Sequence, residues 1–143
     1  FSLSRDVFFV TGAKHFPAAE DPRVYQWMKE IIPNLIWSEA KSYDEWAHRI
    51  SSSECFVSGR YHHTICAASN QVPLVCFPSN SPKIDSSCEM FGINPPIKYS
   101  EPMFIEKTSN EIDMAINDKL PTVESSTMGT ILDLCKNNFV GIP

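Results

Sequence analysis

Short apolar segments alternate with amphipathic helical patterns along residues 7–92, and this alternation is the feature that most constrains the fold. Strands are predicted at residues 7–10, 35–37, 55–57 and 72–77, and a helical pattern follows each of them. The fourth apolar run is continuous, as in a strand covered on both faces. Strand–helix alternation is typical of a parallel sheet with right-handed crossovers. We therefore predict an α/β fold.

Local signals mark where the predicted helices begin and end. Asp21 and Pro22 have the pattern of an N-cap followed by proline at the first helical position. Ser42 with Glu45 three residues later matches a capping box. Ser81 and Pro82 start a further helix, which carries its apolar residues toward Gly92.

The alternation weakens after Gly92. Residues 95–99 are compatible with an edge strand because they contain two prolines, and residues 103–105 are a further possible strand. Thr108 and Glu111 form a second capping-box match before a helix with Ile112, Ala115, Ile116 and Leu120 on one face, and a final helix carries Met128, Ile131, Leu132, Cys135 and Phe139. The chain is therefore expected to end in helices.

Composition limits the class of protein and its partners. A length of 143 residues suits one domain, and a net charge of −5 gives no basic field for nucleic acid. The apolar runs are too short to span a bilayer. The chain opens on Phe1, so we expect a fragment of a larger protein.

The five cysteines, Cys55, Cys66, Cys76, Cys88 and Cys135, are spread singly and mostly in apolar segments. No C-x-x-C pair and no zinc spacing is present. Buried reduced thiols are the expected state, and they fit a reducing compartment. We therefore expect a cytoplasmic location, or the cytosolic face of a membrane system, and no metal site.

The candidate site follows the third predicted strand. Ser58 and Gly59 end that strand, and Arg60, Tyr61, His62 and His63 fall on the turn and the first helical residues. Ligands bind at the carboxyl ends of strands in open α/β sheets, and helix N-termini favour anions. A guanidinium and imidazoles at this position predict a phosphate or carboxylate site, and Gly59 allows close approach of the backbone.

Structural roles compete with this interpretation. Arg60 would pair with a carboxylate, His62 would cap a packed helix, His63 would bind protein groups, and Tyr61 would serve packing. Other residues expected at the same sheet edge are Lys14, His15, Glu39, Lys41, Ser79, Asn80, Ser81 and Lys83. Most would be solvated, but Lys83 lies in a first helical turn, where a cation opposes the helix dipole unless an anion is near.

Several common catalytic motifs are missing. The chain has no G-x-G-x-x-G after a strand, no P-loop and no G-x-S-x-G nucleophile elbow. These absences argue against a nicotinamide dinucleotide enzyme, a P-loop nucleotidase and a serine hydrolase.

The run 55–62, with its Ser58, Arg60 and His62, resembles the polysaccharide pyruvyl transferase family, which carries a (V/I)-S-x-R-x-H segment. A small-residue helix with Ala67 and Ala68 and an x-P-x-(V/I) strand, here residues 72–75, follow as in the family. A loop lysine, here Lys83, and a helix ending near L-G, here 91–92, continue the likeness. The resemblance extends over residues 6–100.

The resemblance implies a glycosyltransferase-B-type protein with two facing Rossmann-like halves. Residues 1–143 would be one Rossmann-like domain, a three-layer sandwich with a mainly parallel sheet, matching the C-terminal half. An N-terminal half would complete the cleft, so the fragment alone would be inactive. Such enzymes move the enolpyruvyl unit of phosphoenolpyruvate onto a sugar or polysaccharide, forming a pyruvate ketal in polysaccharide biosynthesis, without cofactor or metal.

By the same resemblance, Arg60 and His62 would be catalytic, and phosphoenolpyruvate would be bound by Ser58, Gly59, Arg60, Tyr61, His62, His63 and Lys83. Two alternatives stay open. In one, the chain is the donor-binding half of a sugar-nucleotide glycosyltransferase, with Arg60 and Lys83 facing a diphosphate. In the other, it is a non-catalytic glycan-handling domain with the same fold.

Overall fold

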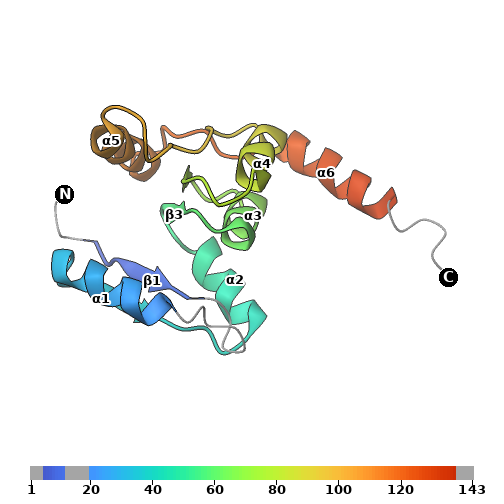
Figure 1. The fold of residues 1–143 in the computed structure, drawn as a ribbon. Coiled ribbons are helices and arrows are strands. Elements are labelled where there is room, and N and C mark those ends of the chain that lie inside the picture. Colours follow the sequence, from blue (N-terminus) through green and yellow to red (C-terminus); the bar gives the residue numbers. More distant parts are fainter. Residues whose placement is uncertain (1–4, 12–19, 138–143) are drawn as a thin grey trace. The chain divides into compact units, whose positions relative to one another are not determined.

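The computed structural model describes residues 5–11 and 20–137, with side chains as far as residue 133. The chain divides into two compact units, Phe1–Ile50 and Ser51–Pro143. Figure 1 shows their elements, and each unit is described by itself. Among the described residues, no helix has the length and apolar character needed to cross a membrane.

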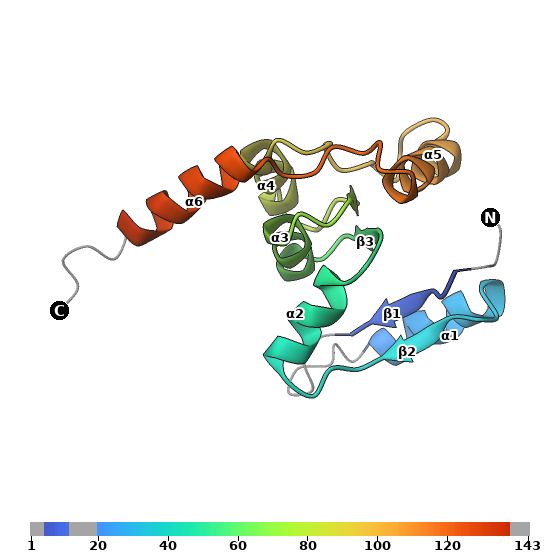
Figure 2. The same cartoon turned by 180° about the vertical axis from the view of Figure 1, so that it is seen from behind.

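Unit 1 is a parallel strand pair with two helices. Strand β1 (Phe8–Val10) pairs in parallel with β2 (Ile36–Ser38), with Phe8 opposite Ile36. Helix α1 (Asp21–Ile31) connects the strands and lies along them, and α2 (Tyr43–Ser51) follows β2 (Figure 2). The rings of Phe9, Tyr25 and Trp37 pack together, with centroids 5.1–5.8 Å apart. These aromatic contacts hold α1 on the strand pair.

The two predicted helix starts in unit 1 have different outcomes. The Glu45 N–H donates to Ser42 Oγ at 3.1 Å, which confirms the predicted cap of α2. The predicted N-cap at Asp21 is wrong by one residue, because Glu20 already has helical dihedrals (φ −87°, ψ −19°) and occupies the cap position. Asp21 becomes the first helical residue and is fully buried.

Unit 2 repeats the strand–helix order. Strand β3 (Phe56–Ser58) pairs in parallel with β4 (Leu74–Cys76), and α3 (Tyr61–Ser69) connects them. Helices α4 (Lys83–Phe91), α5 (Phe104–Ile116) and α6 (Ser125–Asn137) complete the unit. All of β4 is buried, as its continuous apolar sequence predicts. The unit's core contains Val75, Ile97, Ala115 and Leu120.

The structure confirms a mixed α/β chain with parallel strands and C-terminal helices. A single sheet was predicted, but the described strands form two separate pairs, β1–β2 and β3–β4. Each strand has only three residues, which leaves short edges for further pairing. A Rossmann-like three-layer sandwich is therefore not confirmed.

The region after Gly92 departs most from prediction. Residues 95–99 form no strand, although the Ile97 N–H still donates to Cys76 O at 2.8 Å beside β4. The strand predicted at 103–105 is wrong, since α5 already begins at Phe104. Thr108 lies inside this helix, where its hydroxyl donates to Phe104 O at 2.7 Å instead of capping, and Leu120 lies beyond the helix end. Phe104, Ile112 and Ala115 share the apolar face that packs on the core, so the helical period starts before the capping-box match.

Candidate functional site

The carboxyl ends of β3 and β4 lie at the same edge, because the two strands are parallel and Ser58 is opposite Cys76. The turn 59–60 leads from β3 into α3, and residues 77–82 lead from β4 into α4. Two helices of nine residues therefore begin at this edge, with no side-chain hydrogen bond at either cap position. First-turn amides have no acceptor within their own helix. The edge thus has the backbone polarity that favours an anion.

Ser58 and Gly59 build the turn. The Arg60 N–H donates to Ser58 Oγ at 3.0 Å, and the Phe77 N–H donates to Ser58 O at 2.9 Å. Ser58 is buried, so its hydroxyl is engaged with the turn and not turned outward. A Cβ on Gly59 would lie 3.4 Å from Phe77 Cβ and 3.5 Å from Pro78 O. The small residue lets the turn lie directly on the loop after β4.

An exposed group of side chains follows this turn. Arg60 has an extended backbone at the cap position of α3 and is exposed, as are Tyr61 and His62. The rings of Tyr61 and His62 meet edge to face, with centroids 5.4 Å apart. Lys83 Nζ, from the first residue of α4, lies 5.7 Å from the Tyr61 centroid. Tyr61 therefore lies within reach of both an imidazole and an ammonium group.

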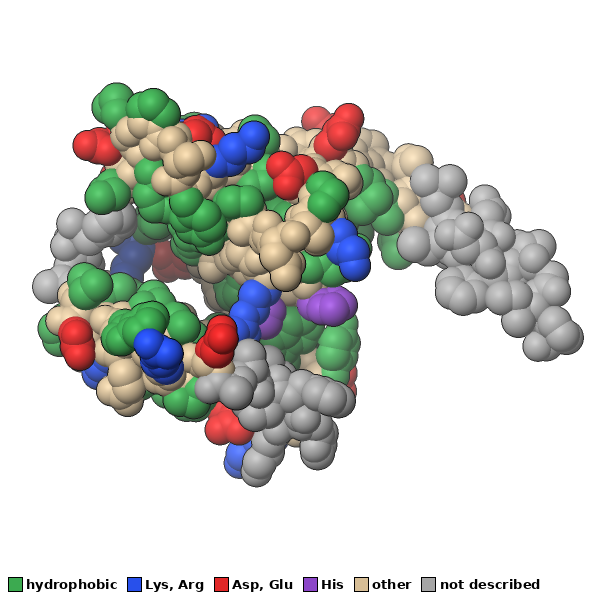
Figure 3. All heavy atoms as spheres, in the orientation of Figure 1, with side chains coloured by type: hydrophobic (Ala, Val, Ile, Leu, Met, Phe, Trp, Pro, Cys, Tyr) green, Lys and Arg blue, Asp and Glu red, His purple; other side chains and the backbone are tan. Residues whose placement is uncertain are grey.

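These contacts bring three of the predicted residues together across two helices. Figure 3 shows histidine and basic side chains at the surface near α3 and α4. A groove of about 270 Å³ adjoins them and is lined by Tyr61, Pro82, Lys83, Ser86, Ser87 and Met90. The Tyr61 and Ser86 hydroxyls and the Lys83 ammonium suit a small polar ligand, whereas the Ser87 hydroxyl already donates to Lys83 O at 2.7 Å.

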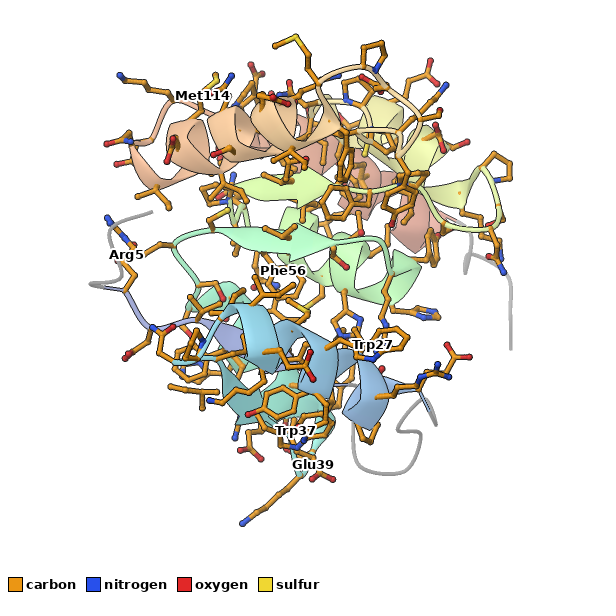
Figure 4. The ribbon with its side chains drawn as sticks, turned by 60° about the vertical axis from the view of Figure 1, so that its left-hand side comes forward. Arg5, Trp27, Trp37, Glu39, Phe56 and Met114 are labelled. Atoms are coloured by element: carbon orange, nitrogen blue, oxygen red, sulfur yellow. The ribbon has the colours of Figure 1, made fainter. Side chains whose placement is uncertain are left out.

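His63 lies apart from this exposed group. Its side chain is only 7% exposed, and its ring stacks on Phe56 with centroids 6.1 Å apart and planes at 12°. Phe56 is labelled on β3 in Figure 4. Consecutive helical residues point about 100° apart, so His62 and His63 face different surroundings. The candidate residues thus divide into an exposed set, with Arg60, Tyr61, His62 and Lys83, and a buried pair, Ser58 and His63.

A second and larger groove lies beside the loop after β4. Its volume is about 510 Å³, and it is lined by Pro78, Ser79, Asn80, Ser81, Pro82, Asp85, Lys98, Tyr99 and Ser100. The sequence placed Ser79, Asn80 and Ser81 at this edge but missed Asp85, Lys98 and Tyr99. Because residues 95–99 form no strand, no strand end marks Tyr99 in the sequence.

Four further residues predicted at this edge, Lys14, His15, Glu39 and Lys41, fall outside unit 2. Lys14 and His15 lie outside the described residues. Glu39 and Lys41 belong to unit 1, where the Lys41 N–H donates to Glu45 Oε2 at 2.7 Å. Within unit 2, two of the four predicted loops, those after β3 and β4, meet at one edge.

The described cysteines are free thiols, and Cys66, Cys76 and Cys88 are buried as predicted. Burial raises the pKa of Cys55 to about 11 and raises the pKa of Cys66. A hydrogen bond between Cys76 and Cys88 raises the pKa of Cys76 and lowers that of Cys88. The side chain of Cys135 lies outside the described residues. Cys55 and Cys66 thus stay protonated at neutral pH.

Residues 13–81 match a family model described as polysaccharide pyruvyl transferase. The match includes the whole turn 58–63 and ends two residues before Lys83. Over these residues the match supports the family that the sequence resembles. No curated protein and no solved structure matches the chain.

Proposed function

Since residues 13–81 of this chain match the model of the polysaccharide pyruvyl transferase family, a family of transferases, we propose that its exposed edge binds phosphoenolpyruvate. The donor's enolpyruvyl group would pass to a sugar or polysaccharide and form a pyruvate ketal. The observation that carries this proposal is the grouping of His62 and Lys83 around Tyr61, beside two helix N-termini, one of which has Arg60 at its cap position. Phosphoenolpyruvate carries a phosphate and a carboxylate, which such a grouping is suited to bind.

The chemistry of ketal formation defines the tasks of the site. Two acceptor oxygens bond to C2 of the donor, the bond from C2 to the phosphate oxygen breaks, and C3 gains a proton. Of the two protons that leave the acceptor hydroxyls, one ends on C3 and the other on the departing phosphate. The reaction is therefore balanced without a redox partner or cofactor.

Each exposed side chain has a role in this scheme. The Arg60 guanidinium holds the phosphate or carboxylate through paired hydrogen bonds, and Lys83 adds a second positive charge. The His62 imidazole donates a proton to the departing phosphate, since histidine exchanges protons near neutral pH. Ser58 and Gly59 shape the turn, Tyr61 lies between His62 and Lys83, and His63 fixes α3 on β3 through Phe56. We also propose that an N-terminal half completes the cleft.

Nuclear magnetic resonance titration tests donor binding without requiring turnover. Phosphoenolpyruvate added to the full natural protein that carries this chain should shift the amide signals of residues 59–63 and 83. Arg60→Ala should weaken binding by at least about tenfold, because a charge-assisted hydrogen-bond pair contributes on the order of 1.5–3 kcal/mol. Lys119→Ala removes an exposed lysine of the same unit and should bind normally.

The outcomes separate the proposal from its alternatives. An absence of shifts in these residues would reject the donor site. Greater thermal stabilisation by UDP-glucose than by phosphoenolpyruvate would favour a sugar-nucleotide glycosyltransferase. Normal pyruvylation by the natural protein after both Arg60→Ala and His62→Ala would favour a non-catalytic glycan-handling domain.

A further inference from the structure

We propose that the larger groove of unit 2 is a binding subsite for a neutral sugar, with the ring of Tyr99 as its platform. The groove lies between the loop after β4 and the turn 98–100. Its volume is about 510 Å³, and it is shallow and widely open to solvent. As the place of the acceptor sugar, it rests on the proposed function.

The aromatic platform is exposed and yet held in place. Tyr99 is 63% exposed, and its ring contacts Phe77 and Phe104 with centroids 5.7 Å and 5.6 Å away. Phe77 and Phe104 also contact each other at 5.5 Å, so the three rings form a triangle. A large ring that is fixed by its neighbours but open to solvent loses little entropy when a ligand stacks on it. The apolar face of a sugar ring fits such a surface.

The backbone that carries Tyr99 is also fixed on both sides. The Ile97 N–H donates to Cys76 O at 2.8 Å, which ties the segment to β4. Glu101 closes the turn, because its carboxylate accepts from the Lys98 N–H at 2.9 Å and from Lys107 Nζ at 2.8 Å. The platform is therefore preorganised on the sheet and on α5.

The polar lining favours a neutral ligand with many hydroxyl groups. Asn80, Ser81, Asp85, Lys98 and Ser100 supply amide, hydroxyl, carboxylate and ammonium groups. These groups include both hydrogen-bond donors and acceptors, as a sugar requires. The Ser79 hydroxyl is engaged within the loop, where it donates to Ser81 O at 3.0 Å. One acidic and one basic side chain leave no net charge, so the Asp85 carboxylate argues against a phosphate in this groove.

The groove begins next to the proposed donor site. Pro78 lines the groove, and its carbonyl oxygen lies 3.5 Å from the position of a Cβ on Gly59. Gly59 immediately precedes Arg60, so a sugar in the groove would be a neighbour of an anion bound at Arg60. Because the groove adjoins the proposed donor site, the acceptor sugar is the ligand that fits it best.

The test uses the full natural protein and three neutral probes: methyl β-galactoside, methyl β-glucoside and methyl α-mannoside. At millimolar concentration, at least one should shift the amide signals of residues 79–81 and 98–100, and glucuronate should shift them less. Tyr99→Ala should weaken that binding about tenfold, while Tyr99→Phe should keep most of it, because the ring is the platform. Met103→Ala, which removes another exposed side chain nearby in sequence, should change nothing.

The outcomes distinguish this inference from the proposed function. If sugars bind at Tyr99 but phosphoenolpyruvate does not bind, the result supports the sugar subsite and rejects the proposed donor site. If phosphoenolpyruvate binds but none of the sugars shifts these signals, or if Tyr99→Ala binds them as the parent does, the groove is not a sugar subsite. Circular dichroism should report the same helix content for Tyr99→Ala and Tyr99→Phe, since Tyr99 is largely exposed.

Discussion

Glu111 on α5 carries a carboxylate that is half enclosed by the protein. Its Oε2 atom is buried and, among the described residues, has no hydrogen-bond partner. Burial raises the pKa of Glu111, the nearby Glu101 carboxylate raises it further, and Lys107 and a hydrogen bond from Asn94 oppose the shift. A raised pKa means that the folded state favours the protonated form. Stability from this group is therefore present below the ordinary carboxyl pKa and is lost as the pH rises through the raised value.

Glu111→Gln should stabilise the chain at neutral pH and have little effect in acid. At about pH 7.5 the variant should raise the free energy of unfolding by less than about 1 kcal/mol, because Glu111 is partly solvated. At about pH 4 the parent carboxyl is protonated, so the difference should vanish. Urea denaturation at both pH values measures this. Glu106→Gln, on an exposed site of the same helix, is the matched control, and an equal gain for Glu111→Gln at both pH values would contradict the interpretation.

At the candidate site, the sequence predicted the local backbone structure but not the orientation of individual side chains. The sequence grouped Ser58 to His63 at a strand end, and the structure indeed has a strand–turn–helix there. It could not tell that His63 turns toward Phe56 while His62 stays exposed, because the rotation of a helix about its axis is fixed by tertiary packing. Tyr99 was overlooked for a similar reason. Its nearness to the loop after β4 depends on contacts between distant segments.

At the scale of elements, α4 ends at Gly92, as the sequence predicts, and the structure shows that this glycine is left-handed. Gly92 has φ +67°, and its N–H donates to Glu89 O at 3.2 Å. Gly92→Ala should destabilise the chain by about 1 kcal/mol, because a Cβ is disfavoured in this region even where no atom lies within 4 Å of it. Chemical denaturation measures the loss.

Gly129→Ala is a control for which we expect no loss of stability or a gain, in contrast to Gly92→Ala. Gly129 lies inside α6, its φ is not positive, and a Cβ there would also meet no atom within 4 Å. Gly129→Ala should therefore leave stability unchanged or raise it by up to about 1 kcal/mol, since alanine favours a helix interior. Equal losses for the two variants would show that backbone conformation is not the cause.

Elements with local signals were predicted best. The cap of α2 needs only Ser42 and Glu45, which are three residues apart, so the sequence contains the whole interaction. The short apolar run 103–105 is compatible with either a strand or a helix, and the core contact of Phe104 decides in favour of α5. Strand pairing is the least local property, and the single predicted sheet accordingly separates into two pairs.

At the scale of the whole molecule, the family match extends from unit 1 into unit 2, whereas the exposed candidate side chains all belong to unit 2. Unit 1 has its own aromatic cluster, and unit 2 has its own aliphatic core. The prediction that residues 1–143 form one domain stays a prediction. It can be tested because the three tryptophans, Trp27, Trp37 and Trp46, all lie in unit 1.

Ile97→Ala opens a cavity in the core of unit 2, where Ile97 is fully buried. The substitution should cost about 2–5 kcal/mol. If the two compact units unfold separately, the helical transition seen by circular dichroism should move to lower temperature, while the transition seen by tryptophan fluorescence should stay in place. Leu35→Ala, at a buried site of unit 1, should shift the fluorescence transition instead. Identical shifts of both signals in both variants would mean that the chain unfolds as one cooperative domain, because coincident transitions are the mark of two-state behaviour.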